Sequence, residues 1–343
     1  MSLRVQTLDR KIWRKDLITD YLLRCYQTNS NAILDFSPEG SCAESLGIYC
    51  LLDDFCLRTG YEKNKVTIIT ANMLEQHDSY IIVKQVTNWY EIQVIQDWLC
   101  DKNINTGINP IKHFANFTSR SNWARLWIAT ILNKNYANKS MQTYHYDPLR
   151  ENYNYNGYIG LDDLVKFNCD IVSDAATFIL GCPLVLDIEY LRNLDNCKNS
   201  LFQHENSYYP IQHPSNLNLL QYYNDIFVDI VVEPNVSGTC FLVTEKLWRC
   251  ILAKRPFIVM SNPNYLANLR KLGFKTFDHW WSEEYDYYGY SDRIKKIEGV
   301  IETISTWSKL KLNSKLIEMS DILEYNYQKF RNLTYLDIQE ALN

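Results

Sequence analysis

Three consecutive residues, Thr244, Glu245 and Lys246, have side chains that together suit the binding of phosphate and hydroxyl groups. They stand where the hydrophobic pattern predicts the start of a helix, and a helix N-terminus attracts anions through its unpaired N–H groups and partial positive charge. Lys246 adds a cation for phosphate, and the Thr244 hydroxyl can cap the helix or bond a phosphate oxygen. Glu245 and Glu233 could accept hydrogen bonds from ribose or sugar hydroxyls. The same residues also make an ordinary helix start, so alone they leave both interpretations open.

The elements that must position these residues form a strand, loop, helix and strand. A buried strand is predicted over 226–233, a helix over 244–253 and a second buried strand over 256–260. A further helix over 264–272 should end at Gly273, in the position after a helix where glycine is common. Strands that alternate with helices indicate a parallel sheet, in which ligands bind beyond the carboxyl ends of the strands.

Two arginines follow an earlier strand in a similar arrangement. A strand is predicted over 114–118, a polar turn with N-cap residues over 119–122, and an amphipathic helix over 123–133. Arg120 and Arg125 therefore lie at a helix N-terminus, where a positive charge is unfavourable unless an anion binds there. This placement favours a phosphate-binding role for both, although a pair of surface arginines is the simpler alternative.

The first part of the chain has a β-loop-α-β pattern, with a strand over 32–36, helical spacing over 42–59 and a strand over 66–70. Glu39 lies in the loop directly after the first of these strands. A carboxylate in that place could act as a general base, which makes Glu39 the candidate catalytic residue. Glu39 could instead cap the following helix, and His113 is a poorer second choice of base.

These patterns predict an α/β fold with two Rossmann-like domains, because 343 residues exceed the size at which single cores stop growing. The expected division is an N-terminal α/β domain over 1–150, a C-terminal Rossmann-like domain over 151–316 and a helical tail over 317–343. Within the second domain we expect a helix over 217–223 and one long helical stretch over 292–316.

Several kinds of site are disfavoured by the motifs that the sequence lacks. There is no Asp-x-Asp, Cys-x-x-Cys, His-x-x-x-His, Gly-x-Ser-x-Gly, Walker loop or Gly-x-Gly-x-x-Gly. Asp187-Ile188-Glu189 is the nearest imitation of a metal-binding Asp-x-Asp, and it falls in an irregular region. We therefore expect no metal site and no required cofactor, and neither a hydrolase, a kinase nor a classical dehydrogenase.

Composition adds limits on partners and compartment. A net charge of -5 without a dense Lys/Arg cluster makes nucleic acid an unlikely partner. No apolar run approaches the roughly 20 residues needed to span a bilayer. The N-terminal residues show no export signal, and ten cysteines in that context indicate reduced thiols. The expectation is a cytoplasmic protein with no membrane span.

A longer match extends the phosphate-site pattern. The sequence V-T-E-K-L-W at 243–248, followed by R-P-F-I-V at 255–259, resembles the donor-binding segment of α1,3-fucosyltransferase-like glycosyltransferases. Glu233-Pro234-Asn235 stands where that family has F-E-N-S, and residues 117–125 resemble its strand that ends in Ser-Asn with an arginine soon after. The loop over 235–240 differs in composition from the family, so the resemblance does not identify the sugar. The first hundred residues show no clear correspondence.

The resemblance implies a metal-independent, inverting glycosyltransferase of the two-domain GT-B fold. It implies that Arg125 and Lys246 contact the diphosphate of a nucleotide sugar, that Glu245 meets sugar or ribose hydroxyls, and that Glu233 and Asn235 lie near the nucleotide. A GDP-sugar such as GDP-fucose is the favoured donor and a UDP-sugar the alternative, bound by the domain over 151–316. A glycan is the expected acceptor, on the side of the domain over 1–150.

Two other functions stay open. Some cytoplasmic transferases glycosylate a modified base in DNA, and a chain can keep this fold as a non-catalytic structural or partner-binding module. Donor binding separates an enzyme from such a module, because a ligand that binds the folded state raises its thermal stability.

Overall fold

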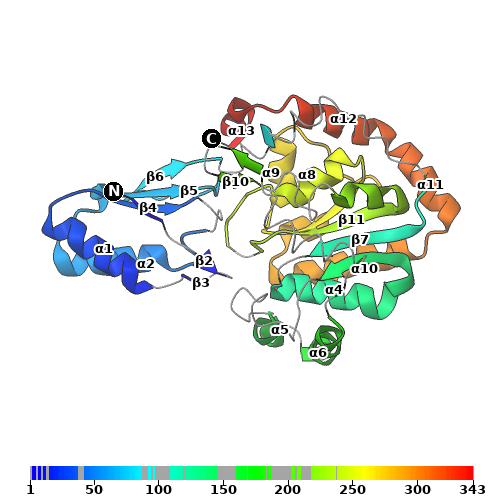
Figure 1. Ribbon diagram of the computed structural model, residues 1–343, viewed down its shortest axis with the longest axis horizontal. Coiled ribbons are helices and arrows are strands. Elements are labelled where there is room, and N and C mark those ends of the chain that lie inside the picture. The colour runs from blue at the N-terminus through cyan, green and yellow to red at the C-terminus, as the bar shows by residue number, and fades with distance from the viewer. Residues whose placement is uncertain are drawn as a thin grey trace. The chain divides into compact units, whose positions relative to one another are not determined.

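A computed structural model shows a mixed α/β protein with two parallel sheets (Figure 1). The structure describes residues 2–4, 7–8, 11–12, 15–37, 42–86, 92–93, 96, 109–118, 121–144, 160–167, 169–182, 184, 186, 202–204, 207–209, 218–236 and 238–342. No helix in these ranges has both the length and the apolar character needed to cross a membrane.

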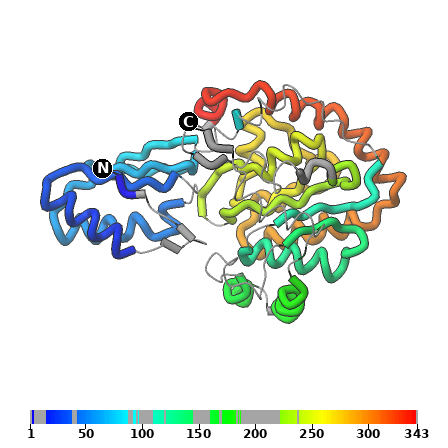
Figure 2. Tube along the Cα trace, viewed as in Figure 1, coloured from blue at the N-terminus to red at the C-terminus, as the bar shows by residue number. Residues whose placement is uncertain are grey.

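The chain divides into two compact units, and each contains one parallel sheet. The first unit combines Met1–Trp89 with Ser237–Leu242 and Thr334–Asn343, and the second combines Tyr90–Val236 with Val243–Leu333. The trace in Figure 2 runs from the blue N-terminus to the red C-terminus, and both ends of the chain are assigned to the first unit.

The first unit is built on four parallel strands in the order β1-β4-β5-β6. Their bounds are Leu3–Arg4, Ala32–Phe36, Val66–Thr70 and Ile81–Lys84. In β4 and β5 buried residues alternate with half-buried ones, the pattern of strands with one face against a core.

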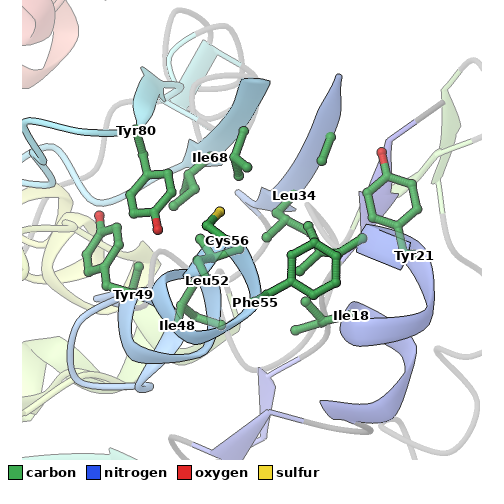
Figure 3. Packing of buried hydrophobic residues seen from close by; sticks show 14 of the residues in the cluster. Ile18, Tyr21, Leu34, Ile48, Tyr49, Leu52, Phe55, Cys56, Ile68 and Tyr80 are labelled. Carbon is green, nitrogen blue, oxygen red and sulfur yellow. The ribbon is translucent and has the colours of Figure 1, made fainter. Parts of the chain in front are cut away.

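Two helices supply the other half of this core, α1 (Lys15–Gln27) and α2 (Ile48–Thr59). Figure 3 shows side chains of both helices and of β4 and β5 directed toward one another, among them Ile18, Leu34 and Leu52. The first unit also contains the antiparallel pair β2 (Thr7–Leu8) and β3 (Lys11–Ile12), and the helix α13 (Tyr335–Leu342).

The second unit has four parallel strands in the order β12-β11-β7-β8. Their bounds are Phe257–Met260, Ile226–Val232, Lys112–Thr118 and Ser140–Tyr144. Every residue of β11 is buried, as expected for a central strand covered on both faces. The strand order reverses between β7 and β11, and such a topological switch point opens a crevice at the carboxyl ends of the two strands.

Helices follow the strands and cover both faces of this sheet (Figure 1). The helix α4 (Trp123–Tyr136) packs with α10 (Tyr290–Ser305), and α8 (Glu245–Leu252) packs with α12 (Ser320–Arg331). The remaining helices of the unit are α5 (Leu161–Phe167), α6 (Val172–Leu180), α9 (Tyr265–Lys271) and α11 (Lys309–Glu318).

Short elements complete the described chain. Strands β9 (Phe202–His204) and β10 (Ser207–Tyr209) form an antiparallel pair. The 3₁₀ helices cover Lys63–Lys65, Ala137–Lys139, Cys169–Ile171, Asn218–Asp225 and Glu284–Tyr287.

The α/β class expected from the sequence is confirmed, and both sheets are compatible with Rossmann-like folds. The observed division differs from the expected boundary at 150, because β7 and β8 pair in one sheet with β11. The expected tail over 317–343 is also divided, since residues up to Leu333 belong to the second unit and the rest to the first.

Three helix predictions need correction. The helix α4 is not amphipathic over its first turns, because every residue from 123 to 132 is buried between the sheet and neighbouring helices. The predicted helix over 217–223 is a 3₁₀ helix over Asn218–Asp225. The predicted stretch over 292–316 is two helices, since α10 ends at Ser305 and Ser308 caps the start of α11.

Candidate functional site

The candidate site lies at the switch point of the second unit, where β7 and β11 are neighbours. Thr118 ends β7 and Val232 ends β11. Each strand leads into a helix, α4 after β7 and α8 after β11, so two helix N-termini follow from this edge of the sheet. That edge is where ligands bind in open parallel sheets.

The N-terminus of α8 is fixed by a buried carboxylate. Glu233, directly after β11, accepts hydrogen bonds from the Thr244 backbone N–H at 3.2 Å and from the Thr244 hydroxyl at 2.5 Å. The hydroxyl of Tyr265, the first residue of α9, donates to the same carboxylate at 2.9 Å. Burial raises the pKa of Glu233, while Lys246 and these hydrogen bonds act against the rise. Glu233 thus holds the helix start in place.

Thr244 is the N-cap of α8, and its side-chain oxygen accepts the Lys246 backbone N–H at 3.4 Å. The Lys246 ammonium lies 3.3 Å from the same oxygen and 2.7 Å from Glu245 Oε1. The Lys246 side chain is 16% exposed and that of Glu245 is 29% exposed. A cation and an anion therefore stand together at a helix N-terminus and remain accessible from solvent.

Glu245 is held in its ionised form. Burial opposes ionisation, but the charge and hydrogen bond of Lys246, with a contribution from Arg249, outweigh it and lower the pKa of Glu245 to about 2. Its carboxylate also accepts its own backbone N–H. The negative charge of Glu245 therefore lies in the first turn of α8, where the helix dipole favours it.

Arg125 joins the end of β11 to the start of α4. Its side chain is buried, and Nε donates to the Val232 carbonyl oxygen at 3.3 Å. Its backbone N–H donates to the side chain of Asn122, the N-cap of α4. The guanidinium therefore lies against the carboxyl end of β11, at the residue that precedes Glu233.

The other predicted residues have different outcomes. Asn235 is half-buried, and its backbone carbonyl oxygen accepts from the Ser261 hydroxyl at 3.2 Å. Glu39 and Arg120 lie outside the described residues. His113, the second choice of base, lies at the amino end of β7, the opposite end from the candidate site, and bonds the Trp307 carbonyl at 2.9 Å. Burial lowers the pKa of His113.

A second buried network of hydrogen bonds connects α8 to β11. Asp229, in the middle of β11, accepts from Tyr223 and from the Cys250 thiol, and Arg249 lies 3.9 Å from it. Arg249 Nε donates to the Tyr223 hydroxyl at 2.8 Å. Burial raises the pKa of Asp229, against the opposing charge of Arg249. This network explains how a charged residue is tolerated inside a buried strand.

Sequence reasoning missed Tyr265 and Arg249. A tyrosine at the start of a predicted helix carries no signal that its hydroxyl meets a glutamate 32 residues away. Arg249 follows Lys246 by one helical turn, which could have suggested a role, but its partner Tyr223 is not evident from spacing. Among the described residues, no group of three or more His, Cys, Asp or Glu side chains could hold a metal ion.

Comparison of the chain with protein-family models, with curated proteins and with solved structures found no match.

Proposed function

We propose that the chain is a glycosyltransferase that binds a nucleotide diphosphate sugar at the N-terminus of α8. The observation that carries the proposal is the arrangement of Thr244, Glu245 and Lys246 on the helix that follows β11, beside the switch point of the sheet. The helix N-terminus and Lys246 suit a diphosphate, and Glu245 suits hydroxyl groups of a ribose or sugar.

The site supplies positive charge where a leaving diphosphate would develop negative charge. Lys246 and the dipole of α8 provide it from one helix, and Arg125 provides it from the start of α4. These groups support metal-independent transfer. Glu233 accepts three hydrogen bonds from within the protein, so we assign it to positioning Thr244 and not to binding the ligand.

The reaction class follows from the resemblance of this segment to fucosyltransferase-like enzymes of the GT-B fold. An acceptor hydroxyl attacks the anomeric carbon of the donor, and the bond from that carbon to the diphosphate breaks with its electron pair leaving on the diphosphate. A general base takes the proton of the hydroxyl, and Glu39 is the candidate from the sequence. A GDP-sugar is the favoured donor, and a glycan is the favoured acceptor.

The first test is a thermal-shift panel of GDP, UDP, CDP, ADP and their sugar conjugates, with and without EDTA. One nucleotide should raise Tm in EDTA, since a ligand at a hundred times its Kd stabilises the folded state by about 2.7 kcal/mol. Lys246→Ala should weaken binding by roughly tenfold or more, the effect of losing a hydrogen bond to a charged group. Lys271→Ala, an exposed lysine at the end of α9, is the matched control.

Four outcomes would change the proposal. A shift that disappears in EDTA would contradict metal independence. A shift that survives in Lys246→Ala would place the ligand elsewhere. No shift with any nucleotide would favour a non-catalytic module, whereas a nucleotide shift with sugar transfer only to DNA would favour the DNA-modifying alternative.

A further inference from the structure

Three tyrosines, Tyr287, Tyr288 and Tyr290, form an exposed group in the second unit that the proposed site does not use. We call them the tyrosine rim. Their side chains are 64%, 40% and 46% exposed. Exposed aromatic surface is common at ligand-binding sites, because burying it against a ligand removes apolar area from water.

Arg293 fixes the tyrosine rim at the carboxyl edge of the sheet. The Arg293 guanidinium donates to the Tyr288 carbonyl at 2.8 Å, to the Asp286 carbonyl at 2.9 Å and also to the Ser261 carbonyl. Ser261 comes directly after β12, whose last residue is Met260. The rim therefore lies at the same edge of the sheet as the N-termini of α4 and α8.

Ring contacts lead from the rim to the N-terminus of α4. The Tyr290 ring is stacked on Phe167, with centroids 5.6 Å apart and an interplanar angle of 14°. Phe167 in turn packs on Trp123, with centroids 4.4 Å apart. Trp123 is the first residue of α4 and precedes Arg125 by two positions. Tyr290 is thus held flat at the end of a row of rings that begins at the first residue of α4.

The backbone of Tyr290 is also unusual. Its φ is 43°, in the left-handed region that a bulky residue rarely adopts. Such conformations persist only where the surrounding structure holds them, and they are frequent at ligand-binding sites. Gly289, the preceding residue, could adopt a positive φ without this cost, yet it is Tyr290 that has the positive φ.

We propose that the tyrosine rim binds the nucleobase of the nucleoside diphosphate, with Tyr290 as the main stacking residue. This inference rests on the proposed function, because it takes the diphosphate to lie between Arg125 and Lys246. A planar heteroaromatic base stacks well on a tyrosine ring held by a second ring behind it. The Tyr287 and Tyr288 hydroxyls can add hydrogen bonds to polar edges of the base.

The test compares nucleoside diphosphates with inorganic pyrophosphate, which has no base. The full chain is titrated calorimetrically with GDP, UDP and pyrophosphate, and the titrations are repeated on Tyr290→Gly. Glycine accepts the positive φ, so this variant removes the ring and keeps the backbone. The preferred nucleotide should bind about ten- to a hundredfold more weakly to Tyr290→Gly, the cost of losing base stacking. Pyrophosphate affinity should not change.

Further variants separate stacking from other effects. Tyr290→Phe should keep the nucleotide affinity, and Tyr288→Ala should reduce it without touching the strained position. Tyr325→Ala, at a similarly exposed tyrosine of α12, is the control and should change neither affinity.

The outcomes distinguish this inference from the function on which it rests. If the nucleotide and pyrophosphate bind to wild type, depend on Lys246, and keep their affinities in Tyr290→Gly and Tyr288→Ala, the rim assignment is wrong and the phosphate site stands. An equal loss of both ligands in Tyr290→Gly would show a structural role and also overturn the assignment. If neither ligand binds to wild type, both proposals fail.

Discussion

Two carboxylates that contact the first residues of α8 have pKa values shifted in opposite directions. Glu233 has only neutral hydrogen-bond donors in direct contact, and burial raises its pKa. Glu245 contacts the Lys246 ammonium, which outweighs burial and lowers its pKa to about 2. Glu233 therefore supports the start of α8, and Glu245 places a negative charge on the surface of that helix.

The pH dependence of Glu245→Gln tests the pairing with Lys246. The pKa of Glu245 falls from 4.5 to about 2 on folding, so its ionised form contributes stability that is fully present above about pH 4.5 and lost as the pH falls through about 2. We expect Glu245→Gln to cost about 1–2 kcal/mol at pH 6, after allowance for partial exposure, and roughly half as much at pH 3.

Guanidinium denaturation of wild type and variant at both pH values measures this difference. Glu233 is present in both proteins, so its contribution to the pH dependence of stability cancels in the comparison of wild type with Glu245→Gln. That contribution has the opposite sign because the pKa of Glu233 is raised. Glu302→Gln, at an exposed glutamate of α10, is the matched control and should show little difference at either pH. A cost for Glu245→Gln that does not vary with pH would contradict the pairing.

The capped helix start at this site was predictable from the sequence. Hydrogen bonds between residues far apart in the sequence were not. Thr244 followed by Glu245 and Lys246 predicted a capped helix start, and the N-cap is confirmed. The role of Glu233 depends on Tyr265 and on the fold of the loop between them, and no local pattern encodes that contact. Sequence reasoning therefore identified Glu233 as a residue near the nucleotide, but not its hydrogen bond with Tyr265.

At the scale of elements, the start of α4 depends on a glycine that sequence reasoning did not single out. Gly160 precedes α5 and has a φ of 84°. A Cβ at this position would lie 2.3 Å from the Trp123 backbone nitrogen, at the first turn of α4. Because α4 also carries Arg125, the packing of Gly160 helps to determine where the arginine lies.

Gly160→Ala should therefore destabilise the second unit strongly. The added methyl group meets backbone atoms that cannot move aside cheaply, and the residue is forced to keep a left-handed φ, so we expect a loss of at least about 2 kcal/mol. Gly299→Ala is the matched control within α10, where a Cβ would meet nothing within 4 Å. That change should stabilise by roughly 0.5–1 kcal/mol.

Chemical denaturation of the two variants measures both effects. Equal small changes would show that the contact between α5 and α4 adjusts freely. Nucleotide binding by the folded Gly160→Ala protein should also weaken, because the start of α4 must shift to accept the methyl group. Unchanged nucleotide affinity would show that ligand binding does not depend on the position of α4.

Element positions were predicted well where hydrophobic runs had clear ends. The strands over Ala32–Phe36 and Val66–Thr70 have the bounds expected from the sequence. The break between α10 and α11 was missed because residues 306–308 contain no proline or glycine to mark it. The order of strands in a sheet, including the switch point, depends on pairings between distant segments that periodicity does not encode.

At the scale of the whole molecule, the units are discontinuous in a way that a linear sequence does not reveal. Asn72 of the first unit binds two residues of the loop between β11 and α8, donating to the Thr239 carbonyl at 2.8 Å and accepting from the Phe241 N–H at 3.0 Å. The loop over Ser237–Leu242 therefore belongs to the first unit. A single expected boundary at residue 150 could not describe a chain that passes from the second unit to the first and back again.

The assignment of α13 to the first unit makes a prediction about which part of the protein a C-terminal variant affects. Ile338 is 5% exposed, whereas Leu336 in the same helix is 63% exposed. Ile338→Ala removes buried methyl groups and should lower the free energy of unfolding of the first unit by about 2–4 kcal/mol. Leu336→Ala removes exposed atoms and should cost less than about 0.5 kcal/mol.

Native-state hydrogen exchange separates the two units, since local unfolding releases the amides of one cooperative region together. In Ile338→Ala, amides of α2 should exchange faster although α2 is far from Ile338 in sequence, while amides of α4 in the second unit should keep their protection. Loss of protection in both helices would show that the units unfold as one. Unchanged protection of α2 would show that α13 does not stabilise the first unit, because a helix that forms part of its core cannot lose a buried side chain without loosening that core.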